Sequence, residues 1–186
     1  DRHVLDDQLP ETLNGDGFTI HYRSKLSTRV PPQVYQIYMQ SRFHVQDLKT
    51  LFQDPDLPHV HIYVYPSAKD KKLMFGGNDT DITDVVTPSI HITAGRWPHP
   101  TLRHELVHAL LSKYGFRGLG FHPNMALTEG IAVALAPSAR FLTLDEGAAS
   151  LFESKKLRSI EDLFSVQFWF AGSARAYTAA GSFVKF

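Results

Sequence analysis

The amino-acid sequence predicts an α+β fold in which a small N-terminal mixed sheet precedes a group of helices. Three observations support this prediction. Short β-prone segments occur in the first half of the chain. A long segment between two of them carries apolar residues at helical spacing. After residue 100, helical periodicity dominates, so we expect the sheet to form from the first half and the helices to follow it.

The first half supplies the strands. Residues 1–16 are polar and weakly periodic, so we expect a loose lead-in there. Strands are predicted at 18–22, 60–65 and 89–93. Two consecutive prolines fit a helix start, and the apolar spacing that follows predicts a helix over 32–53. Residues 66–87 mix turn residues with polar ones, and we expect them to be irregular.

The second half is predicted to be mainly helical. A periodic run predicts a helix over 102–114 that ends near Gly115. A glycine-containing loop is expected over 116–123, and a second helix over 124–135. Three shorter helical segments are predicted at 145–152, 160–164 and 175–186.

Composition narrows the classes of function. Hydrophobic residues make up 43% and charged residues 20% of the 186 positions, as in an ordinary globular domain. The 19 basic residues balance the 19 acidic ones, so phosphate-driven nucleic-acid binding is not expected. There is no cysteine, which excludes disulfides, thiolate metal sites and a cysteine nucleophile.

We expect one domain over residues 1–186. The sequence begins without Met and ends on an amphipathic segment, as a domain excised from a longer protein would. It has no apolar run of membrane-spanning length, so we expect any membrane attachment to come from regions outside this chain.

Residues 104–108 carry the motif that points to chemistry, His-Glu-Leu-Val-His. Residues four apart lie on one face of a helix, so His104 and His108 can point at one ion, and imidazole nitrogen is a good zinc ligand. Glu105 lies about 100° around the helix, near the ion without ligating it. That position suits a general base that takes a proton from metal-bound water.

A third protein ligand is expected from Glu129, which follows His108 by 21 residues on the next predicted helix. A helix, a loop and a returning helix can bring it to the histidine pair. Gly130 and Ala132 are small, which would allow the two helices to approach closely. The alternative for Glu129 is an exposed glutamate at a helix start.

These motifs resemble those of the gluzincin zinc peptidases, the group that includes thermolysin and the aminopeptidase N family. A His-Glu-x-x-His helix followed by Glu-Gly-x-Ala is shared, and the small bacterial peptidase MA-like domains are the most similar. The likeness runs from about residue 18 to the end and includes the segment 176–184.

The resemblance implies roles for the site residues. Glu105 would activate the attacking water, and one Zn²⁺ would polarise the carbonyl of a peptide or protein substrate. Tyr177 would donate a hydrogen bond to the oxyanion, unless it is simply a packed aromatic residue. The strand at 89–93 matches the edge strand that holds an extended substrate in these enzymes.

The sequence also departs from the family pattern. Val133 stands where thermolysin-like enzymes have an Asp that orients a zinc histidine, so the outer shell of the site must differ. The aminopeptidase signature Gly-x-Met-Glu-Asn is absent. Tyr114 occupies the position of the third metzincin histidine.

Other histidines and aromatics have simpler interpretations. His91, His99 and His122 are expected to be ordinary surface or strand histidines. His59 and His61 are expected to face solvent together. The aromatic residues near the end of the chain are expected to pack in a core or form a lid, namely Phe164, Phe168, Trp169 and Phe170.

Three functions from different classes follow. The first is a zinc endopeptidase with Glu105 as general base. The second is a non-catalytic zinc-binding domain of the same fold that binds peptide or a protein partner, although it would have no chemical need for Glu105. The third is an accidental motif on a structural helix that binds no metal.

Overall fold

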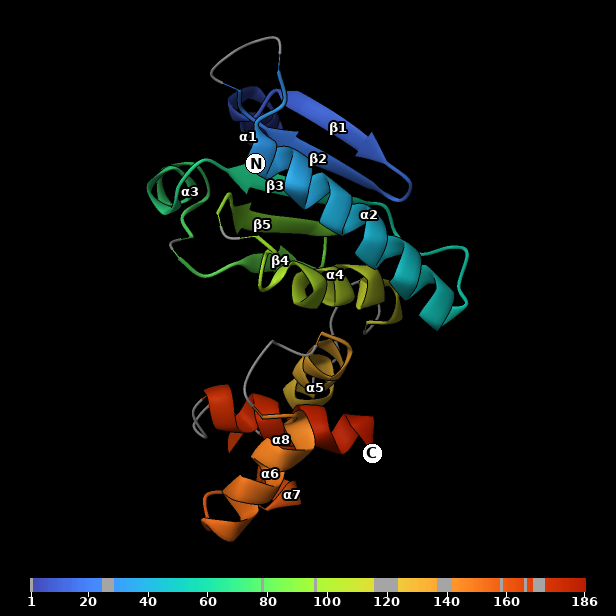
Figure 1. Ribbon diagram of the computed structural model, residues 1–186, viewed down its shortest axis with the longest axis vertical. Helices are drawn as coiled ribbons and strands as arrows, with labels where there is room; N and C mark the ends of the chain where they lie inside the picture. The colour runs from blue at the N-terminus through green and yellow to red at the C-terminus, as the bar shows by residue number, and fades with distance from the viewer. Residues whose placement is uncertain are drawn as a thin grey trace. The chain divides into compact units, whose positions relative to one another are not determined.

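The computed structural model describes residues 2–24, 29–77, 79–95, 97–115, 124–136, 142–157, 159–165, 167–168 and 173–186. The chain is mixed α/β with a five-stranded mixed sheet, which confirms the predicted class at that level. It divides into two compact units, Asp1–Lys113 and Tyr114–Phe186. The first unit holds the sheet, and within the described residues the second is built from helices (Figure 1).

The sheet of the first unit has the strand order β1-β2-β3-β5-β4. Its strands are β1 Glu11–Gly15, β2 Phe18–Tyr22, β3 Val60–Tyr65, β4 Ile82–Asp84 and β5 Ser89–Thr93. The three central strands are parallel, and β1 and β4 pair antiparallel at the two edges. All three predicted strands are confirmed within the residues that the sequence indicated.

The helix α2 (Pro32–Phe52) makes the crossover between the parallel strands β2 and β3. It begins with Pro at its first position and ends at Gln53, whose backbone is left-handed. The predicted helix over 32–53 is therefore confirmed to within one residue. Figure 1 shows α2 lying across one face of the sheet, with α4 (Leu102–Leu111) beside it.

Alternation along the strands places the main apolar core between the sheet and these two helices. The fully buried residues on this face include Phe18, Ile20, Val60, Ile62, Val64, Ile90 and Ile92. Burial of each large apolar side chain contributes about 1.5–3 kcal/mol. The opposite face carries a smaller cluster in which Leu5 and Leu9 pack against Tyr63 and Tyr65.

The loose lead-in predicted for residues 1–16 is wrong. Helix α1 (Arg2–Gln8) precedes β1, and β1 forms a hairpin with β2. The turn between them contains Gly17 with a φ of 85°, a conformation that glycine adopts without strain. An Asp-Gly pair between two short strands is a hairpin signal, and it outweighs the weak periodicity.

The irregular segment predicted over 66–87 is also wrong, because it contains α3 (Ala68–Phe75) and β4. Ser67 caps the start of α3 by accepting a hydrogen bond from the backbone N–H of Asp70. Gly76, with a φ of 89°, ends the helix in the left-handed conformation. Local capping therefore defines a helix that has little apolar periodicity.

A buried ion pair ties this segment to the start of α4. The side chain of Lys71 is fully buried, and its Nζ donates to the Thr80 carbonyl oxygen (2.6 Å) and to Asp81 Oδ1 (3.2 Å). The Thr101 hydroxyl, immediately before α4, donates to Asp81 Oδ2 at 2.6 Å. Because both charges are hydrogen-bonded, the cost of burying them is compensated. Removal of one partner would leave the other charge buried and unpaired.

The second unit contains four helices in its described part: α5 Met125–Leu135, α6 Leu144–Glu153, α7 Ile160–Leu163 and α8 Ser173–Lys185. These bounds agree with the predicted helices to within about two residues. Helix α5 lies against α8, where a Cβ on Gly130 would be 2.8 Å from the Ala180 carbonyl oxygen. The small residue at 130, which we expected to let α5 approach the histidine helix, thus serves the packing of α5 on α8.

None of the helices in the described part of the chain is both long and apolar enough to cross a membrane. The longest, α2, has 21 residues but is amphipathic, with an exposed side that carries charged residues. The predicted loop at 116–123 lies outside the described residues.

Candidate metal centre

Helix α4 carries the His-Glu-x-x-His motif and is held to the sheet by its apolar side. Leu102, Leu106 and Leu110 are fully buried on that side. The predicted helix over 102–114 is confirmed, with its last turn tightened into a 3₁₀ turn at Ser112–Tyr114. His104 lies on the other side of the helix and is half-buried, as is His108.

The two histidines point their Nε2 atoms at each other across one turn of the helix. These atoms are 3.1 Å apart, and the rings are nearly perpendicular, at 84°. Two nitrogens bound to one zinc ion at about 2.0–2.1 Å lie about 2.9–3.4 Å apart for angles at the ion of roughly 90–109°. The separation of His104 Nε2 and His108 Nε2 therefore matches that required of two ligands of one ion.

Glu105 is buried, with only 8% of its surface exposed. Its Oε2 accepts a hydrogen bond of 2.6 Å from the hydroxyl of Thr83 on β4. The same hydroxyl lies 3.1 Å from the Glu105 carbonyl oxygen. Thr83 therefore holds the Glu105 carboxylate in one orientation. Sequence reasoning missed Thr83, because it lies in the segment that was expected to be irregular.

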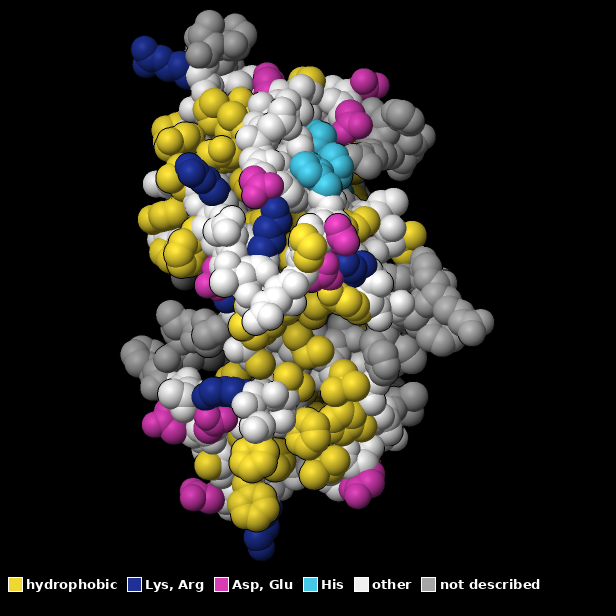
Figure 2. All heavy atoms as spheres, turned by 90° about the vertical axis from the view of Figure 1, so that its right-hand side faces the viewer, with side chains coloured by type: hydrophobic (Ala, Val, Ile, Leu, Met, Phe, Trp, Pro, Cys, Tyr) yellow, Lys and Arg dark blue, Asp and Glu magenta, His cyan; other side chains and the backbone are white. Residues whose placement is uncertain are grey.

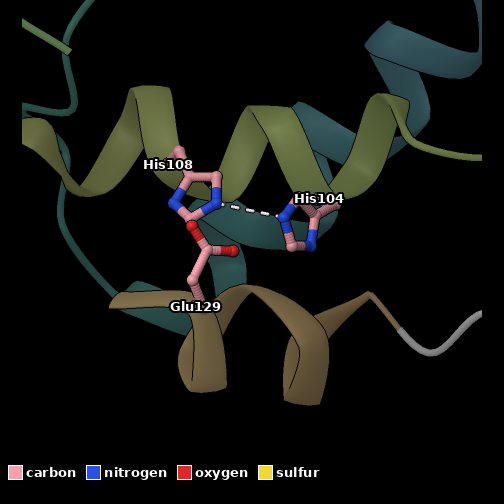
Figure 3. Close-up of side chains that lie close together, drawn as sticks. All are labelled: His104, His108 and Glu129. Carbon is pink, nitrogen blue, oxygen red and sulfur yellow. Dashed lines mark hydrogen bonds between the residues drawn. The ribbon is translucent and has the colours of Figure 1, made fainter. Parts of the chain in front are cut away.

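Glu129 lies in the second turn of α5. Asn124 caps this helix by accepting hydrogen bonds from the backbone N–H groups of Ala126 (3.1 Å) and Leu127 (3.3 Å). One ligand atom of each of His104, His108 and Glu129 lies within 4.8 Å of the others, so this group could hold a metal ion (Figure 3). Two imidazoles and one carboxylate form a donor set that suits zinc.

Val133, at the position where the resemblance would place an acid, has a packing role. A Cβ on Gly181 of α8 would be 2.7 Å from Val133 Cγ1, so these two residues lie in close contact. The position is therefore occupied by the interface of α5 with α8. An outer-shell acid in this chain would have to come from another residue.

Tyr177 belongs to the core of the second unit. Its ring stacks on that of Phe168, with centroids 5.8 Å apart and planes at 23°. It also packs against the small cluster of buried residues that includes Ala176 and Ala180. The structure therefore shows Tyr177 as a packed aromatic, and an additional role for its hydroxyl stays a prediction. The core packing expected of Phe168 is confirmed, whereas Trp169 and Phe170 lie outside the described residues.

Two of the histidines expected to be ordinary surface or strand residues are buried: His91 in the strand β5, which fits the strand alternative, and His99 in the loop before α4. His91 is 2% exposed and lies between the rings of Phe75 and Tyr63, with centroids at 3.7 and 5.0 Å. Burial, helped by the positive charge of Lys71, lowers the pKa of His91 to about 4. His99 is 6% exposed, and burial also lowers its pKa. Phe75 of α3 covers His91 on β5, and Gln40 of α2 hydrogen-bonds with the backbone of His99. Sequence periodicity does not reveal either contact.

The predictions for three further histidines, His59, His61 and His122, have different outcomes. His59 is exposed, as predicted, while His61 is half-buried. His122 lies outside the described residues.

The expected edge position of the strand at 89–93 is wrong. β4 pairs antiparallel with β5 and lies outside it, with Thr83 opposite Ile90. A three-residue strand is too short to be predicted from alternation, which is why the true edge was missed.

Comparison with known proteins does not assign the chain to a family. No protein-family model matches the chain, and a search of curated proteins also finds no match. The geometry of α4 and its surroundings therefore carries the functional proposal.

Proposed function

We propose that this chain is a zinc-dependent peptidase of the gluzincin type. In this proposal, His104, His108 and Glu129 hold the ion and Glu105 is the general base. The observation that carries it is the pair of Nε2 atoms 3.1 Å apart on a helix, α4, that also carries a buried and hydrogen-bonded carboxylate, that of Glu105. The resemblance of the two helical motifs to those of gluzincin peptidases supports the same function.

A zinc ion at this site would lower the pKa of a bound water and polarise the substrate carbonyl. Glu105 takes a proton from the attacking water and can return it to the leaving amine. Thr83 occupies Oε2 of Glu105, which leaves Oε1 as the oxygen that accepts this proton. The burial of Glu105 keeps bulk water from competing for the carboxylate.

The substrate would bind as an extended strand along β4. This strand forms the edge of the sheet, and its outer backbone groups can pair with a peptide. Because β4 also contributes Thr83, the same strand would both hold the peptide and orient the base. The Tyr177 hydroxyl is proposed as a donor to the oxyanion, for which Tyr177→Phe is the direct test.

The first experiment compares the wild-type chain with Glu105→Gln for zinc content and for hydrolysis of an unstructured protein such as casein. We expect Glu105→Gln to keep its zinc and to lose about 10²–10⁴-fold in rate, because the amide cannot accept the proton. Glu153→Gln, at an exposed position on α6, is the matched control and should leave both unchanged.

Each failure identifies a different error. Hydrolysis at the wild-type rate by Glu105→Gln would show that the assigned base is wrong. Zinc binding by a wild-type chain that hydrolyses no peptide would instead favour the non-catalytic zinc-binding domain. A wild-type chain that binds no zinc after reconstitution would exclude both the zinc peptidase and the non-catalytic zinc-binding domain.

A further inference from the structure

A second group of histidines lies in the first unit, on the opposite face of the sheet from α4. It consists of His21 on β2 and of His59 and His61 at the start of β3, and we call it the histidine cluster. His21 Nε2 and His61 Nδ1 are 2.9 Å apart. The rings of His59 and His61 meet edge to face, with centroids 5.2 Å apart.

The positions of these residues follow from the strand register. Thr19 of β2 pairs with His61 of β3, so His21 lies diagonally across from His61 on the same face. His59 precedes His61 by two residues and therefore points to the same side. The cluster thus lies within one unit and involves none of the residues of the candidate metal centre.

An acidic residue supports the buried member of the cluster. Asp6 Oδ1 lies 3.5 Å from His21 Nδ1, the nitrogen that faces away from His61. Tyr63 donates a hydrogen bond of 3.2 Å to the same oxygen of Asp6, and its ring stacks on His21. A carboxylate on the far nitrogen of a histidine is the outer-shell arrangement that orients imidazole ligands in metal sites.

The cluster is open to solvent on one side. His21 is 8% exposed, whereas His61 is half-buried and His59 is exposed. Figure 2 shows histidine side chains gathered in a patch on the surface of this unit. An ion can therefore reach the ligands without unfolding of the strands.

We propose that the histidine cluster binds a second divalent transition-metal ion, such as Zn²⁺. His21 Nε2 and His61 Nδ1 supply the first two ligands, because their separation of 2.9 Å lies within the range of about 2.9–3.4 Å for two nitrogens on one ion. His59 supplies the third. Its Nε2 now lies 2.9 Å from Thr19 Oγ1, so this third ligation requires His59, an exposed side chain, to adopt another rotamer.

The ligand chemistry sets the class of ion. Three imidazoles favour Zn²⁺, Ni²⁺ and Cu²⁺ over Mg²⁺ and Ca²⁺, which prefer oxygen ligands. Because the ligands must be unprotonated, acidification weakens binding. A hydrogen bond between His21 and His61 without any ion is the competing explanation of the 2.9 Å separation.

The test is zinc stoichiometry in the metal-free chain, measured by calorimetric titration with Zn²⁺ alone and by elemental analysis after gel filtration. We expect about two zinc ions in the wild type and about one in His61→Gln, which keeps only the candidate metal centre. His104→Gln should also bind about one ion, lost from the other site. His44→Gln removes a histidine outside both groups and should bind as many as the wild type.

Circular dichroism checks that each variant is folded. If His61→Gln does not fold, His59→Gln, at an exposed position, replaces it in the test. Zinc titration of His104→Gln, followed by imidazole NMR, should shift the signals of His59 and His61. Equal zinc stoichiometry in wild type, His59→Gln and His61→Gln would overturn the second site. Loss of zinc from His61→Gln but not from His104→Gln would support it while rejecting the proposed catalytic metal.

Discussion

The hydroxyl of Thr83 lies 2.6 Å from Glu105 Oε2, so the edge strand of the sheet directly orients the proposed general base. Thr83 is held in place by the pairing of β4 with β5, and Glu105 by the packing of α4 on the sheet. A peptide that pairs with β4 would therefore bind to the same strand that orients the carboxylate.

Thr83→Val should lower the turnover number by about 10- to 150-fold, because a hydrogen bond to a charged group contributes about 1.5–3 kcal/mol. Valine has the same shape but cannot donate. Thr83→Ser keeps the hydroxyl and should retain most of the activity. Steady-state kinetics with a peptide substrate measure the effect. We expect kcat to fall more than KM rises, with zinc content unchanged; a change in KM alone would mean that Thr83 contributes only to binding.

Glu129→Ala should weaken zinc binding by more than about 100-fold, beyond the 10–100-fold that loss of an outer-shell residue costs. Glu129→Asp keeps a carboxylate on a shorter side chain and should bind zinc with an intermediate affinity. Competition against a chromophoric chelator gives the affinities. If both variants bind zinc as tightly as the wild type, the third ligand is a different residue.

Gly130→Ala should destabilise the second unit by about 1–3 kcal/mol. The added Cβ would lie 2.8 Å from a backbone oxygen of α8, and backbone cannot move aside as a side chain can. Gly147→Ala on α6 is the control, since its Cβ would meet only the methyl group of Thr178 at 2.9 Å. That variant should lose less stability than Gly130→Ala, because a side-chain methyl group can shift more easily than backbone and alanine adds up to about 1 kcal/mol of helix propensity. Urea unfolding compares the two, and equal stability would contradict the close packing of α5 on α8.

The buried His91 should make the metal-free protein less stable as the pH falls from about 6.5 to about 4. Burial lowers the pKa of His91 to about 4 in the folded state, so within this window the unfolded chain binds one more proton. Its contribution to the free energy of unfolding is present above the unfolded pKa and decreases on acidification, by on the order of 2–3 kcal/mol.

Urea unfolding in EDTA at several pH values tests this contribution. His91→Gln cannot bind the proton, and its free energy of unfolding should fall less steeply between pH 6.5 and 4 than that of the wild type. His59→Gln removes an exposed histidine and should retain the wild-type slope. An unchanged slope in His91→Gln would show that His91 is not the group responsible.

The sequence indicates those features that repeat along the chain or lie within one element. Alternation located β2, β3 and β5, and the four-residue spacing of His104 and His108 placed both on one side of α4. Helix geometry brings their Cβ atoms to about 5–6 Å, and the side-chain rotamers then set the Nε2 separation. Glu129 was a candidate ligand because it follows His108 by 21 residues on the next predicted helix, and the resemblance added support; no periodic signal singled it out.

Features that depend on distant pairings were missed. Thr83 and Glu105 are 22 positions apart, and their contact exists only because β4 is added at the edge of the sheet. The burial of His91 requires α3 to cover the sheet, and α3 is defined by its caps instead of an apolar stripe. Such contacts are set by tertiary packing, for which a single sequence carries no direct signal.

Because the Lys71 side chain is fully buried, its chemical modification can be used to measure local opening of the fold. An amine reagent can modify the other described lysines from solvent, but it reaches Lys71 only when α3 and the approach to β4 separate from the rest of the unit. The rate at which Lys71 is labelled therefore measures how often that region opens under native conditions. Because Asp81 links Lys71 to Thr101, the same rate also reports how firmly the first turn of α4 is anchored.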